Sequence, residues 1–201
     1  MQIIDLTMPI NKDMPVFAGS RIPELHQTAS IEKDGWTEHH ISISTHIGTH
    51  IDAPWHFIKD GKKLDEVGLH KLIGDGIVID CRKYKEVPVE AVKNKNIRKK
   101  IVFFYTGQSK KTKEEYGKNA PVISEELAKL LVKSKVKCIG VDSFSPDEAP
   151  YNVHRILLSK DMPIVENLAN LDELLNKKFQ AIILPLKVDL DGAPCRAIAV
   201  V

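Results

Sequence analysis

The chain has 201 residues, 43% of them hydrophobic and 28% charged, which is the composition of a folded globular protein rather than a disordered one. Its 29 basic and 27 acidic residues give a formal net charge of +2, which is too balanced to predict nucleic-acid binding. No apolar run approaches the roughly 20 residues needed to span a bilayer, so no membrane association is expected.

The N-terminal segment and the cysteines favour a cytoplasmic protein. Residues 1–10, MQIIDLTMPI, have neither a basic start nor a cleavage site, so they are not interpreted as a signal peptide. The three cysteines are far apart and odd in number, which favours neither a metal knuckle nor a disulfide framework. Two basic runs, residues 93–100 and 109–113, are interpreted as solvated loops and helix faces, with an anionic partner as the alternative.

Residues 41–52 alternate between two kinds of side chain. The odd positions hold isoleucines and threonines, whereas the even positions include His46, His50 and Asp52. Because successive side chains of a strand point to opposite faces, a strand places these three residues on one face. A helix would instead rotate Asp52 about 200° away from His50. The pattern therefore predicts a strand, which ends near Pro54 because proline cannot donate to a sheet ladder.

Two imidazoles and a carboxylate on one face are ligands that zinc, manganese and iron accept. Gly48, between the two histidines, leaves room above the backbone for an ion or a substrate. His56 follows Pro54 and therefore lies beyond the end of the predicted strand. Its side chain can approach the open side of the ion, where a general base is needed. The alternative interpretation is a polar strand whose histidines only satisfy hydrogen bonds.

Further along the chain, short β-branched runs alternate with helical patterns. An amphipathic helix is expected over residues 124–134, with Ser124 as its N-cap, and shorter helices over 152–159 and 170–177. A turn is expected over 189–194. Buried strands are predicted at residues 76–80, 100–106, 136–142, 180–186 and 195–201. These elements predict one mixed α/β domain, spanning residues 1–201.

Two further metal ligands are suggested in the C-terminal half. His154 lies in YNVHRILL, and Glu166 follows the apolar MPIV segment. A carboxylate at the end of a buried strand needs a compensating partner, because burying it alone is costly. The alternatives are a histidine on a helix face and a glutamate that caps a helix.

The sequence resembles a known family, the metal-dependent cyclase-like hydrolases that include bacterial kynurenine formamidase and isatin hydrolase. The resemblance is carried by STHIGTHIDAPWHF (residues 44–57), by HRILLSKDMPIVENLANLDEL and by the ending LPLKVDLDGAPCRAIAV, and it covers nearly the whole chain. It implies a mixed-sheet fold of the swivelling β/β/α type. It also implies a homodimer or homotetramer.

The resemblance also implies a role for each site residue. His46, His50 and Asp52 would be metal ligands, with His154 and Glu166 completing a second site so that Asp52 and Glu166 bridge two ions. The metal would be zinc, with manganese as the alternative, bound as one or two ions. The resemblance makes His56 the catalytic proton carrier and places Phe17 against the substrate ring.

The implied activity is that of an arylformamidase, which hydrolyses N-formylkynurenine to kynurenine and formate with metal-activated water. One departure concerns Tyr105, which precedes Thr106 where formamidases usually have an arginine. The alternatives are therefore hydrolysis of a cyclic or other small amide, as in the isatin hydrolases, and a non-catalytic protein that binds a metal or a small acid.

Overall fold

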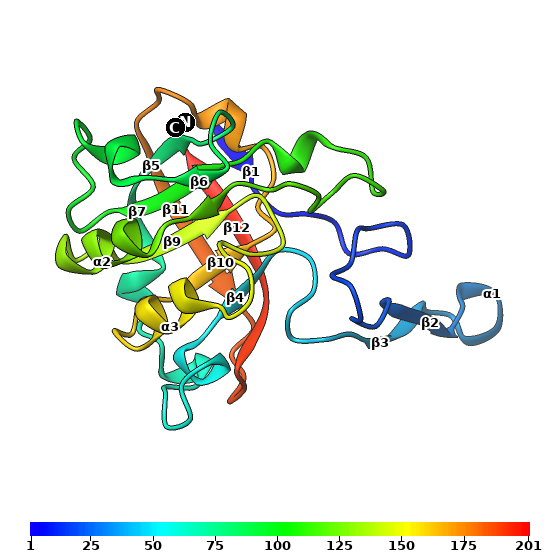
Figure 1. The fold of residues 1–201 in the computed structure, drawn as a ribbon. Coiled ribbons are helices and arrows are strands. Elements are labelled where there is room, and N and C mark those ends of the chain that lie inside the picture. Colours follow the sequence, from blue (N-terminus) through cyan, green and yellow to red (C-terminus); the bar gives the residue numbers. More distant parts are fainter.

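A closed ring of strands forms the centre of the protein (Figure 1). The computed structural model describes all 201 residues. Its main sheet has the strand order β1-β12-β11-β5-β7-β9-β10-β4, and β4 also pairs with β12, so seven strands close into a barrel-like ring. The ring strands are β4 (His50–Asp52), β5 (Ile73–Asp80), β7 (Ile101–Tyr105), β9 (Cys138–Val141), β10 (Ile164–Glu166), β11 (Phe179–Pro185) and β12 (Gly192–Val200).

Strand β12 closes the ring because different parts of one of its edges pair with different strands. Its first residues, Gly192–Pro194, pair antiparallel with β4. Its last residues, Ile198–Val200, pair with β1 (Ile3–Asp5). The other edge of β12 is covered by β11, which is also antiparallel to it. The sheet is mixed, because β5, β7, β9 and β10 run parallel to their neighbours in that series.

The remaining elements are short. Two small sheets pair β2 (Glu24–Ala29) with β3 (Glu38–Ser42) and β6 (Glu86–Val87) with β8 (Val122–Ile123). The α-helices are α1 (Ile31–Asp34), α2 (Glu125–Lys133) and α3 (Asn152–Leu158). None of these helices has the length and the apolar character that crossing a membrane requires. Six 3-10 turns occur at Pro54–His56, Leu64–Glu66, Leu69–Lys71, Val89–Val92, Gln108–Lys110 and Leu171–Leu174.

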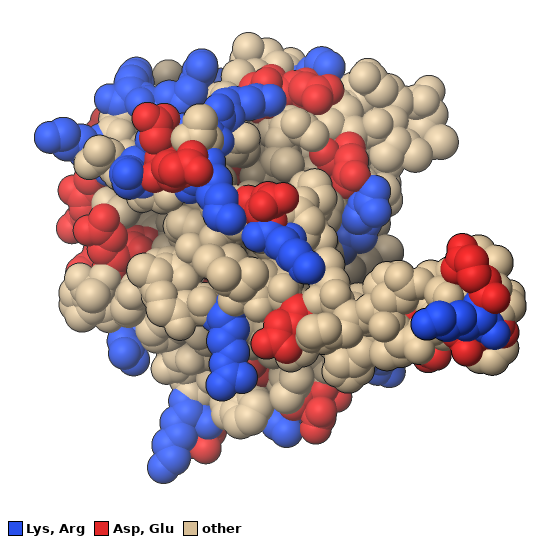
Figure 2. Space-filling view, turned by 90° about the vertical axis from the view of Figure 1, so that its right-hand side faces the viewer, with Lys and Arg blue, Asp and Glu red and all other residues tan.

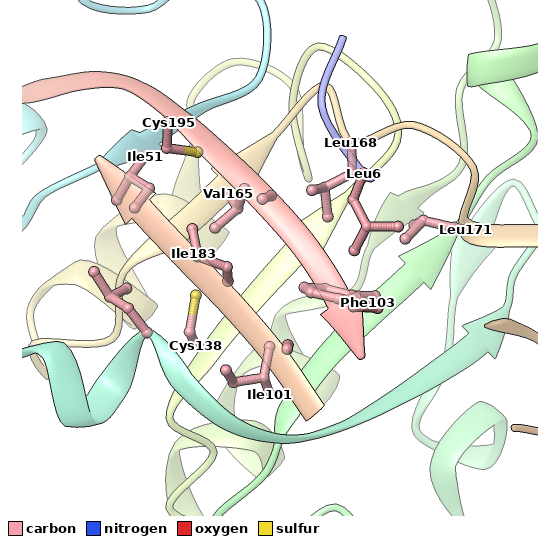
Figure 3. Close-up of a cluster of buried hydrophobic side chains, with 14 of the residues drawn as sticks. Leu6, Ile51, Ile101, Phe103, Cys138, Val165, Leu168, Leu171, Ile183 and Cys195 are labelled. Carbon is pink, nitrogen blue, oxygen red and sulfur yellow. The ribbon is translucent and has the colours of Figure 1, made fainter. Parts of the chain in front are cut away.

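Two apolar cores lie on opposite faces of the sheet, and the side chains of β7 show how they are separated. Ile101, Phe103 and Tyr105 belong to the core inside the ring, which Figure 3 shows, whereas Val102 and Phe104 belong to the outer core. The outer core is covered by helices α2 and α3. A strand buried on both faces has a continuous apolar sequence, which is why residues 100–106 lack polar alternation.

The predicted fold class is confirmed, and most of the predicted elements are present. All five downstream strands are found, with β5 and β12 beginning at Ile73 and Gly192 rather than at 76 and 195, so the turn predicted at 189–194 overlaps β12. Helix α2 has the expected cap, because the Ser124 side chain accepts a hydrogen bond from the backbone N–H of Leu127.

The helix predicted over 170–177 was wrong. It is a single 3-10 turn, Leu171–Leu174. Asn170 and Asn176 both have positive φ values, of 53° and 60°. Left-handed residues at both ends confine the helical segment to about one turn.

The continuous strand predicted over 41–52 was also wrong. Strand β3 ends at Ser42 and β4 begins at His50, and the chain bends between them. Gly48 has a φ of +57°, in the left-handed region that glycine adopts without a steric cost. A Cβ there would also lie 3.2 Å from Ile10 and 3.3 Å from Met14. The bend therefore requires glycine, and it removes His46 from the strand.

Residues 22–43 form an arm that projects away from the ring (Figure 1). It consists of β2 and β3 with α1 at its tip, and every residue of β3 is exposed. Figure 2 shows the arm extending from the body of the molecule with charged side chains gathered at its tip. Several large apolar side chains of the arm are exposed: Ile22 (58%), Ile31 (66%), Trp36 (60%) and Ile41 (56%).

Candidate metal centre

Strands β4 and β10 bring the two halves of the predicted site together. They pair antiparallel, with Glu166 opposite His50 and Val165 opposite Ile51. Ile51 and Val165 point into the core inside the ring. His50, Asp52 and Glu166 therefore project from the other face, because side chains alternate along each strand. Helix α3 packs on that face and supplies His154.

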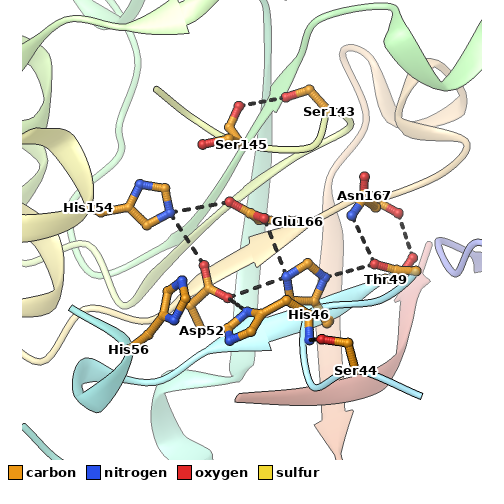
Figure 4. Close-up of polar contacts among 12 residues, drawn as sticks. Ser44, His46, Thr49, Asp52, His56, Ser143, Ser145, His154, Glu166 and Asn167 are labelled. Carbon is orange, nitrogen blue, oxygen red and sulfur yellow. Dashed lines mark hydrogen bonds and ion pairs between the residues drawn. The ribbon is translucent and has the colours of Figure 1, made fainter. Parts of the chain in front are cut away.

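Four buried side chains converge at this point (Figure 4). His50 Nε2 lies 3.4 Å from Asp52 Oδ1 and 3.3 Å from Glu166 Oε2. His154 Nε2 lies 3.5 Å from Asp52 Oδ2 and 3.3 Å from Glu166 Oε1. Each carboxylate thus faces both imidazoles.

A second group of residues shares Asp52 with the first. His46 Nδ1 lies 2.7 Å from Asp52 Oδ1, although His46 is on the bend rather than on β4. His56 stacks on His46, with the ring centroids 3.9 Å apart. It belongs to the 3-10 turn that begins at Pro54, so Pro54 ends the strand as predicted. Possible ligand atoms of His46, Asp52 and His56 lie within 4.8 Å of one another.

The residues present fit a divalent cation. His50 Nε2 and Asp52 Oδ2 are buried and make no hydrogen bond. Buried polar atoms are rarely left unpaired, because their desolvation is not compensated. Possible ligand atoms of His50, Asp52 and Glu166 also lie within 4.8 Å of one another. Imidazole and carboxylate ligands suit zinc, manganese and iron.

A pocket of about 370 Å³ opens beside these residues. His46, His50, His56, His154 and Glu166 line one side of it. The rest is largely apolar and aromatic, and includes Phe17, Phe57, Ile47, Phe144 and Tyr151. Phe17 meets the edge of Phe144 at a centroid distance of 5.8 Å. The pocket therefore combines converging ligand groups with an aromatic wall.

The sequence pattern that defines the Cyclase family matches residues 4–148. This chain belongs to the Cyclase family. It is 30% identical to a kynurenine formamidase from Bacillus cytotoxicus over 97% of this chain and 95% of that protein.

Solved structures of similar proteins agree with this assignment. Isatin hydrolase A from Labrenzia aggregata, solved with benzyl benzoate, superposes with a TM-score of 0.90 at 27% identity, covering 98% of this chain and 93% of that one. A structure described as a potential metal-dependent hydrolase with cyclase activity has a TM-score of 0.85 at 25% identity, covering 98% and 96%.

In this Cyclase-family chain, each histidine that faces the carboxylates has its other ring nitrogen bound to a protein acceptor. His50 Nδ1 donates to the Gly48 carbonyl at 2.8 Å. His154 Nδ1 bonds to Asp147 at 2.5 Å, and Asp147 also accepts the backbone N–H of Val153 at 2.7 Å. Such contacts fix the tautomer and the ring orientation of metal-binding histidines.

The charges of the Cyclase-family site shift the pKa values of its histidines. Burial lowers the pKa of His50, but Asp52 and Glu166 outweigh it and raise the pKa to about 10. Burial likewise lowers the pKa of His154, but the carboxylates of Asp147, Asp52 and Glu166 outweigh it and raise the pKa to about 12. The pKa of His56 is lowered, chiefly by burial. His56 is therefore neutral at pH 7 and can accept a proton.

Three residues around this site were not predicted from the sequence. Asp147 and Asp191 bond to His154 and His46. Asn167 bonds to the Gly48 carbonyl at 3.0 Å and lines the pocket. Only Asn167 carried a signal, since it directly follows Glu166, whereas the two aspartates lie in turns that resemble ordinary surface loops.

Proposed function

We propose that this chain is a metal-dependent arylformamidase that hydrolyses N-formylkynurenine to kynurenine and formate. The observation that carries the proposal is a cluster of buried imidazoles and carboxylates, with unpaired ligand atoms, at the wall of an aromatic pocket. The similarity to the kynurenine formamidase of Bacillus cytotoxicus over almost the whole chain supports the same activity.

In this proposal, His46, His50 and Asp52 hold the first ion, and His154 and Glu166 complete a second site. Asp52 and Glu166 serve both sites, because each carboxylate lies within 3.5 Å of both His50 and His154. Zinc is the proposed metal, with manganese as the alternative that the same nitrogen and oxygen ligands accept. An ion with an open position supplies a nucleophile from water at neutral pH and polarises a carbonyl group.

His56 is the proposed proton carrier. Its pKa is lowered by burial, so it is neutral near pH 7 and can take a proton from water. It would then deliver that proton to the aniline nitrogen as the formyl C–N bond breaks. Its ring lines the pocket beside His46, and this supports the proposed role. A site that only stores metal has no need of this neutral histidine.

Phe17 is the proposed contact for the aromatic ring of the substrate. It lies at the pocket, 46% exposed, and packs against Phe144. An apolar wall of this kind stabilises an aryl group, while the carboxylates and imidazoles orient the amide.

Hydrolysis of a neutral cyclic amide is a second candidate function. The 17 residues that line the pocket include no lysine or arginine. The carboxylate of N-formylkynurenine therefore has no lysine or arginine partner in the pocket, whereas an uncharged lactam needs none. The fold similarity to isatin hydrolase A supports this candidate.

A homodimeric or homotetrameric assembly is also proposed, with the arm as the contact. Four large apolar side chains lie more than half exposed on this one projecting arm, and their burial in a subunit contact would stabilise an assembly. Closed symmetric dimers are the commonest assembly among soluble homo-oligomers. A cytoplasmic location is proposed because all three cysteines are free and buried.

The test is an activity assay on metal-stripped protein. Zn²⁺ or Mn²⁺ is added back, and release of the aromatic amine from N-formylkynurenine is compared with ring opening of isatin. We expect activity to depend on the added ion and to be higher with N-formylkynurenine. Faster hydrolysis of isatin would favour the second candidate, and inactivity toward both with bound metal would contradict the proposal.

A further inference from the structure

His46 differs from the other histidines of the site in how it is held. His50 lies on β4 and His154 on α3, whereas His46 lies on the bend that precedes β4. Its side chain is 22% exposed, compared with 2% and 4% for the other two. Neither a regular backbone nor close burial therefore determines the direction of its ring.

The two nitrogens of His46 face two different carboxylates. Nδ1 lies 2.7 Å from Asp52, the carboxylate that also faces His50 and His154. Nε2 lies 2.8 Å from Asp191 Oδ2, on the other side of the ring. Asp191 is absent from both groups of converging ligand atoms. A neutral imidazole carries one proton, so the carboxylate that takes the N–H decides which nitrogen can bind an ion.

Asp191 is fixed in place by the backbone around it. Its carbonyl oxygen accepts the N–H of Ala53 at 2.9 Å, directly after the ligand strand β4. The next residue, Gly192, pairs with Asp52. A Cβ at Gly192 would lie 2.9 Å from Cε1 of His46, so glycine lets the ring lie against β12 with Nε2 toward Asp191.

We propose that Asp191 is the positioning residue of His46. It accepts the Nε2–H of His46, and this leaves the lone pair of Nδ1 directed toward Asp52 and the ion. Asp191 thus binds the ring nitrogen of His46 that faces away from the ion. Asp147 does the same for His154, and the Gly48 carbonyl does the same for His50. The inference rests on the proposed metal dependence and adds to it a residue that contacts neither the ion nor the substrate.

The test measures Zn²⁺ affinity by competition with a chelator. Asp191→Ala should weaken binding about 10- to 100-fold, the usual effect of losing such a partner, with the number of ions at saturation unchanged. Asp191→Asn should bind close to wild type, because the amide oxygen still accepts the N–H. Asp189→Ala is the matched control in the same turn. The Asp189 side chain is 78% exposed and approaches only Lys63, at 3.6 Å, so its removal should change nothing.

A second readout uses the wild-type protein and needs no variant. Nitrogen-15 spectra of the histidine side chains in the Zn²⁺-loaded protein should place the proton of His46 on Nε2. A proton on Nδ1, wild-type affinity in Asp191→Ala, or loss of one ion equivalent in that variant would each overturn the inference. The last result would make Asp191 a ligand. If the wild-type chain bound no Zn²⁺ at all, the proposed metal dependence itself would fail, and the inference would fall with it.

Discussion

Glu166 lies directly opposite His50 in the pairing of β10 with β4, and their side chains approach to 3.3 Å. A register shift of one residue would turn Glu166 to the inner core and Val165 to the site, because strand side chains alternate with a period of two. The correct register is therefore a condition for the candidate centre, and each of its neighbouring residues can be tested separately.

Replacing Glu166 with glutamine should weaken metal binding, most strongly at the second site. The change keeps the shape of the side chain but removes a charge that faces both His50 and His154. The number of bound ions, measured by elemental analysis, should fall from two to one if two ions bind to the wild type. Equal metal content together with unchanged activity would restrict the site to its N-terminal half.

The control for this variant is Glu173→Gln. Asp172 looks suitable in the sequence, but it pairs with Lys110 at 2.9 Å and is not on an exposed helix. Glu173 is exposed and forms no ion pair, so its substitution should leave metal binding unchanged.

Replacing His50 with alanine should remove both metal and hydrolysis. His50 Nε2 is one of the unpaired buried atoms at the centre, so the variant loses a proposed ligand directly. The secondary structure should persist, because β4 is held by backbone pairing to β10 and β12. Circular dichroism and metal analysis check the two halves of this prediction, and full metal occupancy in the variant would defeat the assignment.

Replacing His56 with alanine should separate binding from catalysis. If His56 carries protons, the variant should retain its metal while kcat falls about 10²- to 10⁴-fold. His56 also belongs to a group of converging ligand atoms with His46 and Asp52. Loss of an ion from the variant would therefore assign His56 to metal binding.

Metal binding should release protons and should strengthen as the pH rises. The pKa values of His50 and His154 are raised, to about 10 and about 12, so both rings are protonated at pH 7 without an ion. An ion needs the unprotonated nitrogen, and binding must therefore displace these protons. Calorimetry in buffers with different ionisation enthalpies should give different observed heats. Heats that do not depend on the buffer would contradict the prediction.

Removing the apolar surface of the arm should dissociate the proposed assembly. The double variant Trp36→Ser, Ile41→Ser takes away two exposed side chains without touching the ring. Light scattering should then show a smaller particle than the wild type, while Lys33→Ser at the tip of the arm should change nothing. A wild-type chain that is monomeric at micromolar concentration would argue against the assembly itself.

Local alternation accounts for what the sequence could predict of the site. It correctly places His50 and Asp52 on one face of a strand. A different local signal, the continuous apolar run of residues 100–106, predicts the buried strand β7, whose side chains pack on both faces. Alternation failed at Gly48, whose positive φ breaks the strand, because a glycine in the sequence does not reveal its backbone angles. Asp147 and Asp191 also could not be predicted, since their contacts with the histidines depend on how distant loops pack around the ring.

The closure of the ring at β4 affects the energetics of cation binding. Hydrogen bonds to β10 on one edge and to β12 on the other determine where the backbone of this three-residue strand lies. Chains whose ligands are disordered before binding lose part of the interaction energy to the ordering of those ligands. Here the backbone of His50 and Asp52 is paired on both edges before a cation binds, so little backbone conformational entropy remains to be lost on binding.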